Sequence, residues 1–338
     1  MGYNYLNLPQ QYSMPLVSPQ YYPKGWFKNG HFSTIYSAKI RRGPMLEYKR
    51  DRLTLSDGDF LDLDWSLSKA KDNTQTKSVV ILLHGLEGNA QRSYMRGQAS
   101  TLLAHGFDIC AMNFRGCSGT DNLKLQSYNA GKTEDLDQVV THITKLNRYS
   151  RIYAVGFSLG GSLLLNYLGA KKGDYQQIFK AAAVSTPLDL SASIQRLSHW
   201  DNRAYQWVFL STLKAKYRQK QRAYPMDLSV DAPRAMTSLK DFDNLYTAPV
   251  HGYFNAEDYY QKNSPINSLE AVEQPLLILN ALNDSFLSTT CIPIGLAQRS
   301  KNIYLEAPKY GGHVGFYEPS GPYYNETRVS DFFTAHGA

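Results

Sequence analysis

The sequence predicts an α/β fold, in which a mostly parallel sheet is flanked by helices and interrupted by a mostly helical insertion. Apolar strand-like runs alternate with helix-length segments, the order that right-handed crossovers and a parallel sheet require. The alternation stops at Thr186-Pro187 and resumes at Pro275. With 338 residues, 43% of them hydrophobic and 19% charged, the chain has the composition of a globular protein with a sizeable core.

These patterns divide the chain into three parts. Residues 1–25 are rich in Tyr, Gln, Asn and Pro, and we expect them to form an N-terminal arm on the surface. Residues 26–187 and 264–338 are expected to form the sheet domain. Residues 188–263 contain helical pieces but no buried strand, and they form the predicted helical cap.

A hairpin is expected before the parallel strands. Met45–Leu55 and Phe60–Leu67 have strand-like patterns, and the Asp-Gly between them favours a tight turn because glycine adopts positive φ. The aspartates here could suggest a calcium loop, but apolar residues alternate with them and no glycine holds the sixth loop position. We therefore expect a hairpin with one solvated face that carries Asp59, Asp62 and Asp64.

The parallel sheet is predicted from continuous apolar runs, which are typical of strands buried on both faces. The runs are Ser78–Leu83, Phe107–Met112, Ile152–Phe157, Ala181–Val184, Pro275–Asn280 and Ile303–Glu306. The helices expected around them are Tyr94–His105, Thr133–Leu146 with Thr133 as its N-cap, Leu159–Leu168 and Tyr324–Thr334.

One motif indicates nucleophilic chemistry. Gly156-Phe157-Ser158-Leu159-Gly160 matches GxSxG and stands between an apolar strand and a helical segment. A strand-to-helix turn this tight forces the serine into a strained conformation, and the two glycines remove Cβ atoms that would clash. Ser158 is therefore the candidate nucleophile, held at the positive end of a helix.

A serine hydroxyl needs a base, and the base needs an orienting carboxylate. In sheets of this type the acid and then the histidine follow the serine, each on a loop after a later strand. His313 lies between glycines beyond the last predicted strand, and Asp284 lies beyond the preceding one. Asp243 and Asp258 follow no predicted strand, so Asp284 is the expected acid.

Two backbone N–H groups are expected to bind the oxyanion that forms when the serine attacks a carbonyl. One belongs to Leu159, the residue after the nucleophile. The other is expected from Leu86 in the glycine-containing loop His84–Gly88, which follows the first parallel strand. His84 is expected to hold this loop by hydrogen bonds.

The motifs together resemble the α/β-hydrolase superfamily and, within it, the YheT-like esterases, related to embryogenesis-associated and lipid-active hydrolases. The similarity runs from about Trp26 to the C-terminus. The segments that carry it, besides GxSxG, are Asn29–Ile35, Asp57–Trp65, His84–Gly88, Asn113–Gly119 and Gly311–Phe316. Phe242-Asp243, Thr247–Pro249 and Asp258–Tyr260 also resemble the end of that family's cap. Many relatives have Asp-Asp-Pro-Phe where this chain has Asn283-Asp284-Ser285-Phe286, so the acid is retained and its neighbours differ.

The resemblance implies a serine carboxylic-ester hydrolase with the catalytic triad Ser158, Asp284 and His313. We expect it to act through an acyl-enzyme on short- to medium-chain or lipid-like esters, with no metal and no organic cofactor. An acyltransferase that passes the acyl group to an alcohol is the nearest alternative. A non-catalytic binding protein on the same fold is less favoured, because all three triad positions are filled.

Two features of the cap allow more than one interpretation. The aromatic residues Trp200, Trp207 and Phe209 are expected to roof the substrate pocket, although each could instead pack the cap onto the sheet domain. A basic helical segment is either a solvated face or a docking site for an anionic membrane surface, and it carries Lys214, Lys216, Arg218, Lys220 and Arg222.

The net charge and the cysteines indicate which binding partners and which cellular setting to expect. The 36 Lys+Arg against 29 Asp+Glu give a net charge of +7, too weak and too evenly spread for nucleic-acid binding. The three cysteines, Cys110, Cys117 and Cys291, lack disulfide or metal-ligand spacing and favour a reducing, cytoplasmic setting. We expect a small-molecule ester or lipid substrate and no obligate protein partner.

Overall fold

A nine-stranded sheet forms the centre of the computed structural model, which describes residues 16–69, 77–170 and 177–335. The strand order is β1-β9-β8-β7-β6-β4-β5-β3-β2, and only the β2–β3 and β3–β5 pairs are antiparallel. The strands are β1 Leu16–Val17, β2 Lys49–Thr54, β3 Phe60–Ser66, β4 Lys77–Leu83, β5 Asp108–Asn113, β6 Tyr149–Phe157, β7 Ile178–Val184, β8 Leu276–Leu279 and β9 Ile303–Glu306. The predicted mostly parallel sheet is therefore confirmed.

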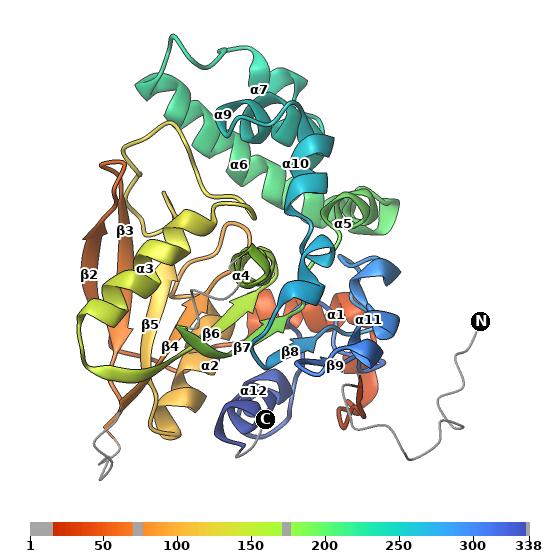
Figure 1. Cartoon of the computed structure of the whole chain (residues 1–338). Helices are drawn as coiled ribbons and strands as arrows, with labels where there is room; N and C mark the ends of the chain where they lie inside the picture. The colour runs from red at the N-terminus through yellow and green to blue at the C-terminus, as the bar shows by residue number, and fades with distance from the viewer. Residues whose placement is uncertain (1–15, 70–76, 171–176, 336–338) are drawn as a thin grey trace.

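Helices cover both faces of this sheet (Figure 1). The helices α3 (Thr133–Lys145) and α4 (Leu159–Ala170) pack on one face, and α2 (Ser93–Ala104) and α12 (Tyr324–Thr334) pack on the other. The expected N-cap of α3 is shifted by one residue, because Lys132 occupies that position and the helix begins at Thr133. Both faces of the central strands are thus shielded from water, as their continuous apolar sequences require.

The described part of the expected N-terminal arm, residues 16–25, packs on the sheet domain. Leu16–Val17 pairs in parallel with β9 and extends the sheet by one strand. Tyr21 is only 1% exposed and its ring packs against Phe316 and Tyr324. Residues 1–15 lie outside the described part of the chain.

The β2–β3 hairpin is confirmed, but its expected solvated face is wrong. Asp59, Asp62 and Asp64 are each no more than 1% exposed. Asp62 accepts two hydrogen bonds from the Arg52 guanidinium, and Asp64 accepts two from Arg50. These bidentate pairs explain how carboxylates occupy alternate strand positions without facing water.

The part of the chain that connects β7 to β8 forms a cap of helices, seen at the top of Figure 1. Its α-helices are α5 Leu190–Leu197, α6 Arg203–Ala223, α7 Ala232–Ala235, α8 Leu239–Phe242, α9 Ala248–Val250 and α10 Ala256–Asn263. Two further short helices, α1 (Gly30–Ile35) and α11 (Ile294–Arg299), belong to the sheet domain. No helix in the described residues combines the length and hydrophobicity needed to cross a bilayer.

Candidate active site

Ser158 occupies a sharp turn between β6 and α4. Its φ of +52° is unusual for a residue with a side chain, and its N–H donates to the Val184 carbonyl at 3.0 Å. A Cβ on Gly160 would lie 2.4 Å from the His84 carbonyl oxygen, so glycine is required there. The strained turn places the Ser158 hydroxyl at the N-terminus of α4, as the GxSxG motif predicts.

The structure brings Ser158, Asp284 and His313 together at the carboxyl ends of their strands. His313 Nε2 lies 2.9 Å from Ser158 Oγ, and His313 Nδ1 lies 2.8 Å from Asp284 Oδ2. With Nδ1–H donating to the carboxylate, Nε2 is free to accept the serine proton. The Asp284 carboxylate is fully buried, and the His313 side chain is 10% exposed.

The histidine loop is held by residues that the sequence analysis did not single out individually. The His313 N–H donates to Thr34 Oγ1 at 2.8 Å, and the Gly312 N–H donates to Asn283 Oδ1 at 3.0 Å. Thr34 belongs to α1, in the Asn29–Ile35 segment that the family resemblance included. This segment therefore fixes the backbone that carries the imidazole.

Phe286 contacts both His313 and Asp284 and holds them in place. Its ring stacks on the His313 imidazole with a centroid distance of 4.3 Å, and its N–H donates to Asp284 Oδ1 at 2.9 Å. The neighbouring Asn283-Asp284-Ser285-Phe286 sequence was the only available signal for this role.

Leu159 and the loop that carries Leu86 lie beside Ser158. Leu159 follows Ser158 directly, and the Gly85 backbone packs so closely that a Cβ there would be 3.0 Å from Ser158 Cβ. Neither the Leu86 N–H nor the Leu159 N–H donates a hydrogen bond to the described part of the chain. Both N–H groups are therefore available to an oxygen of a bound substrate.

His84 stabilises the loop that carries Leu86. Its Nδ1 lies 2.8 Å from the Gly85 carbonyl oxygen, and the Phe114 N–H donates to its Nε2 at 3.1 Å. Burial lowers the pKa of His84 to about 3, so the ring stays neutral and can serve as donor and acceptor at once. This arrangement agrees with the structural role expected for His84.

A partly open cavity of about 460 Å³ extends from Leu86 and Leu159 under the cap. This volume is typical of a site for a small organic molecule. Its walls are mostly apolar, with side chains from the cap that include Leu190, Ile194, Leu213, Leu239 and Phe242.

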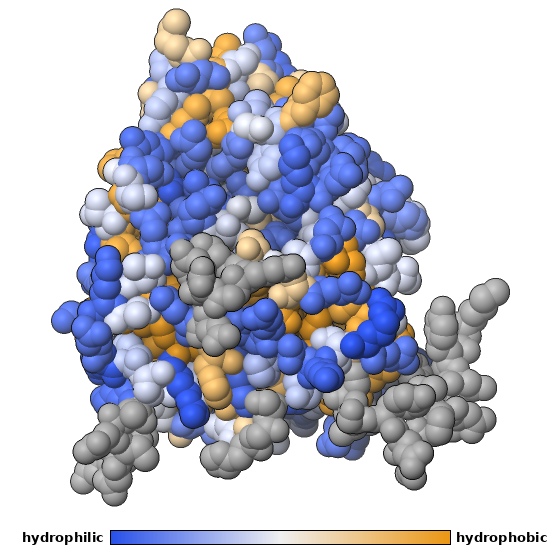
Figure 2. Space-filling model, viewed as in Figure 1, coloured by the Kyte–Doolittle hydropathy of each residue, from blue (hydrophilic) through white to orange (hydrophobic). Residues whose placement is uncertain are grey.

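The aromatic residues expected to roof the pocket do not line this cavity. Trp200 and Trp207 are 73% and 70% exposed, because they lie on the outer side of the cap. Phe209 is partly buried and packs edge-on against Phe286 at 6.1 Å, outside the cavity wall. On the face shown in Figure 2, the cap carries isolated hydrophobic residues among hydrophilic ones.

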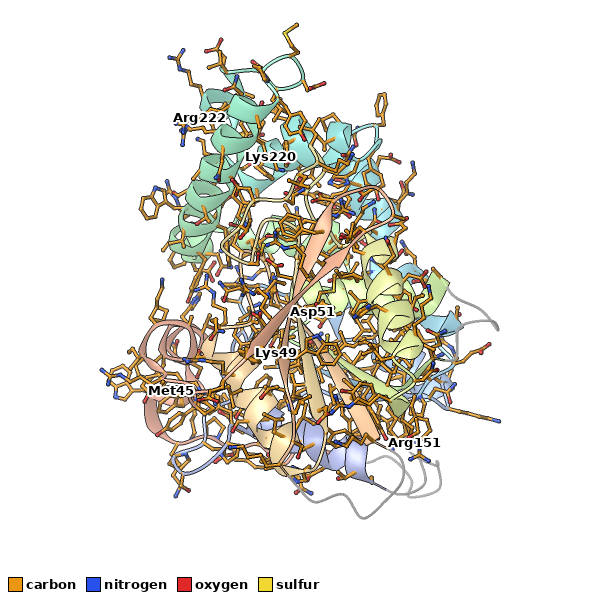
Figure 3. The ribbon with its side chains drawn as sticks, turned by 90° about the vertical axis from the view of Figure 1, so that its left-hand side faces the viewer. Met45, Lys49, Asp51, Arg151, Lys220 and Arg222 are labelled. Atoms are coloured by element: carbon orange, nitrogen blue, oxygen red, sulfur yellow. The ribbon has the colours of Figure 1, made fainter. Side chains whose placement is uncertain are left out.

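The basic segment of α6 is divided between the interior and the surface. Lys214, Lys216 and Lys220 donate to groups of the protein, and Lys216 and Lys220 also border the cavity. In Figure 3, Arg222 points away from the molecule, whereas Lys220 lies on the inner side of the helix. Of the five, Arg218 and Arg222 are exposed and the three lysines are partly buried, so this segment does not present a continuous cationic face.

Asp243, in the cavity wall, has a carboxyl group with a raised pKa. Its oxygens accept hydrogen bonds from Tyr260 Oη and Thr247 Oγ1, both at 2.6 Å. Burial raises the pKa of Asp243 to about 6, and the two hydrogen bonds offset only part of this effect. The folded chain therefore binds this proton more tightly than the unfolded chain, in which aspartate titrates near about 3.9.

We expect ionisation of Asp243 to destabilise the fold as the pH rises from about 4 to about 6. Below this range both states are protonated and the carboxyl has no electrostatic cost, whereas above it the full cost applies. The free energy of unfolding of Asp243→Asn, compared with that of the wild type, should therefore be about 2 kcal/mol higher at pH 7.5 than at pH 4. This value allows for screening of the charge by solvent. Urea unfolding at both pH values measures this change, and a difference independent of pH would contradict it.

Among the described residues, no cluster of three or more His, Cys, Asp or Glu side chains could hold a metal ion.

Comparison with known protein families identifies the class of enzyme. The profile of the alpha/beta hydrolase fold matches residues 78–320. This match covers more than half of the chain, so the protein is an α/β hydrolase.

Relatives narrow this class further. "Putative esterase YheT" of Escherichia coli (strain K12) is 33% identical over 324 residues, covering 94% of each chain. "Phospholipase ABHD3" of Homo sapiens is 30% identical over 314 residues, covering 91% of this chain and 76% of the relative. An esterase of Pyrococcus furiosus, Pf2001, shares the fold with a TM-score of 0.55 at 18% identity, covering 86% of this chain and 98% of its own. The chain belongs to the YheT-like family of α/β hydrolases, and its relatives support ester hydrolysis as its chemistry.

Proposed function

We propose that the chain is a serine carboxylesterase that forms an acyl-enzyme on Ser158. The observation that carries this proposal is the continuous hydrogen-bonded series from Ser158 Oγ through His313 to Asp284, with distances of 2.9 and 2.8 Å. Such a series activates a hydroxyl that is otherwise a weak nucleophile at neutral pH.

The reaction proceeds in two steps. His313 Nε2 takes the Ser158 proton as Oγ attacks the ester carbonyl, and the Leu86 and Leu159 N–H groups stabilise the oxyanion. The imidazolium, oriented by Asp284, then donates its proton to the departing alcohol and leaves an acyl group on Ser158. Water repeats the sequence, releases the acid and restores the serine.

The cavity supports an ester with an apolar acyl chain as substrate. Its largely apolar walls begin at the expected oxyanion donors and continue beneath the cap, so a chain on the reacting carbonyl would lie among Leu213, Leu239 and Phe242. The names of the relatives, which include a phospholipase and a monoacylglycerol lipase, agree with a lipid-like ester.

The proposal is tested by labelling the purified chain with a fluorophosphonate, which reacts with activated serines. We expect one label, located on Ser158 by peptide mapping and absent from Ser158→Ala. Labelling of that variant at another serine would identify a different nucleophile, and no reaction of the wild type would favour a non-catalytic role.

Product analysis separates hydrolysis from acyl transfer. The wild type is incubated with a medium-chain p-nitrophenyl ester in the presence and absence of ethanol. Release of the free acid as the main product in both cases supports the esterase proposal. An ethyl ester as the main product at low ethanol concentration would support an acyltransferase instead.

A further inference from the structure

One ion pair joins the cap to the loop expected to bind the oxyanion. Lys216 of α6 places Nζ 2.9 Å from Glu87 Oε1, in the residue that follows Leu86. The Glu87 side chain is 5% exposed and that of Lys216 is 33% exposed. Burial lowers the pKa of Lys216, but Cys117 and Glu87 raise it above its ordinary value, so the ammonium group remains charged.

Glu87 holds a backbone conformation that glycine would favour. The Gly88 N–H donates to the Gly85 carbonyl at 3.0 Å, which closes a four-residue turn with Glu87 at its third position. The φ of Glu87 is +54°, and a side chain in this region is strained. Contacts made by that side chain must therefore help to keep the turn in place.

The turn fixes the direction of the Leu86 N–H. This N–H and the Gly85 carbonyl belong to the same planar peptide group and point in opposite directions. The Gly85 oxygen is held by the Gly88 N–H and by His84 Nδ1 at 2.8 Å. If Glu87 leaves its positive φ, the Gly88 bond is lost and the Leu86 N–H can rotate.

Two groups hold Glu87 by its side chain. Tyr128 Oη accepts from the Glu87 N–H at 2.9 Å and donates to Glu87 Oε1 at 2.6 Å. Tyr128 belongs to the sheet domain, as does Arg92, which donates to the Glu87 carbonyl at 2.8 Å. Lys216 is thus the member of this network that the cap supplies.

We propose that Lys216 is a positioning residue. From the cap it binds the Glu87 carboxylate and thereby orients the Leu86 N–H toward the oxyanion. The inference rests on the proposed esterase function. It assigns the cap a part in the chemistry as well as in substrate enclosure, because the oxyanion loop is complete only when α6 is seated on it.

The test compares Lys216→Met with Lys214→Met. Lys214 lies on the same helix, outside the cavity wall, and its ammonium donates to the Met236 carbonyl within the cap. We expect Lys216→Met to lower kcat about 10-fold or more with KM changed less than about 2-fold, since loss of a whole oxyanion donor costs about 10²- to 10³-fold. Lys214→Met should retain the wild-type kcat, and Lys216→Arg should recover much of it.

Binding of a trifluoromethyl ketone, which forms a tetrahedral adduct with an active serine, provides the second measurement. Its affinity for Lys216→Met should fall by the same factor as kcat/KM, as expected for an interaction made in the transition state. In a Glu87→Gln background, the further change to Lys216→Met should have little effect. If Lys216→Met does not fold, as judged by circular dichroism, Lys216→Gln takes its place with the same expectation for kcat and ketone affinity.

Wild-type kcat and ketone affinity in folded Lys216→Met or Lys216→Gln would overturn this role of Lys216, as would an equal loss in Lys214→Met. Failure of the proposed function has a different signature. In that case the wild type itself neither hydrolyses the ester nor reacts with the fluorophosphonate.

Discussion

Replacing Ser158 or His313 by alanine is expected to lower kcat for ester hydrolysis by about 10⁶-fold, and the double variant should be hardly worse than either. In the proposed mechanism Ser158 Oγ and His313 Nε2, which are 2.9 Å apart, take part in the same proton transfer, so losing either partner removes the same step. Asp284→Asn should lower kcat by about 10⁴-fold, because an amide beside Nδ1 favours the wrong tautomer. Residual hydrolysis would come from the backbone oxyanion donors.

Steady-state kinetics with a medium-chain p-nitrophenyl ester measure these effects. His142→Ala is the matched control, since His142 contacts Asp51 at 3.6 Å on the β2 side of the sheet, away from the site. It should retain the wild-type kcat. A His313→Ala variant that melts like the wild type and retains kcat within about 10-fold would show that another group is the base.

The strands were predictable where local sequence alone determines burial. A run such as Val79–Leu83 is completely buried on both faces, and its composition has few other stable arrangements. The pairing of Leu16–Val17 with β9 was not predictable, because two residues have no periodicity and their partner strand lies almost 300 residues away. The buried aspartates of β3 were misassigned for a related reason, since alternation alone cannot show which cations will cover one face.

In the candidate site, too, local sequence motifs were predictable and contacts between distant segments were not. The GxSxG turn and the order of serine, acid and histidine predicted three residues that the structure brings together, because each follows a strand that the sequence itself reveals. The bonds that support the triad join distant segments, such as Thr34 to His313 and Lys216 to Glu87. Trp207 was misassigned because its direction around α6 depends on how the cap is seated.

The largest expected effect on stability concerns Arg115, in the Asn113–Gly119 segment of the family resemblance. Its side chain is 1% exposed, and its guanidinium makes two 2.7 Å hydrogen bonds to Asp135. It also contacts Asp59 at 3.0 Å and Asp57 at 2.7 Å. Arg115→Met should lower the free energy of unfolding by about 3–5 kcal/mol, because the buried carboxylates of Asp59 and Asp135 would lose this cation.

A comparison of Arg115→Met with Asp57→Asn distinguishes loss of the buried guanidinium from loss of a single ion pair. The Asp57 side chain is 41% exposed and water can solvate it, so this variant should lose less than about 1 kcal/mol. Without Arg115, the folded-state pKa values of Asp59 and Asp135 rise, so these carboxylates become protonated more easily at low pH. Protonation removes the repulsion between them, so Arg115→Met should lose less stability at pH 5 than at pH 7.5. Urea unfolding at the two pH values measures both comparisons. Equal losses in the two variants, or a deficit in Arg115→Met that does not change with pH, would mean that the guanidinium acts through its packing and not through its charge.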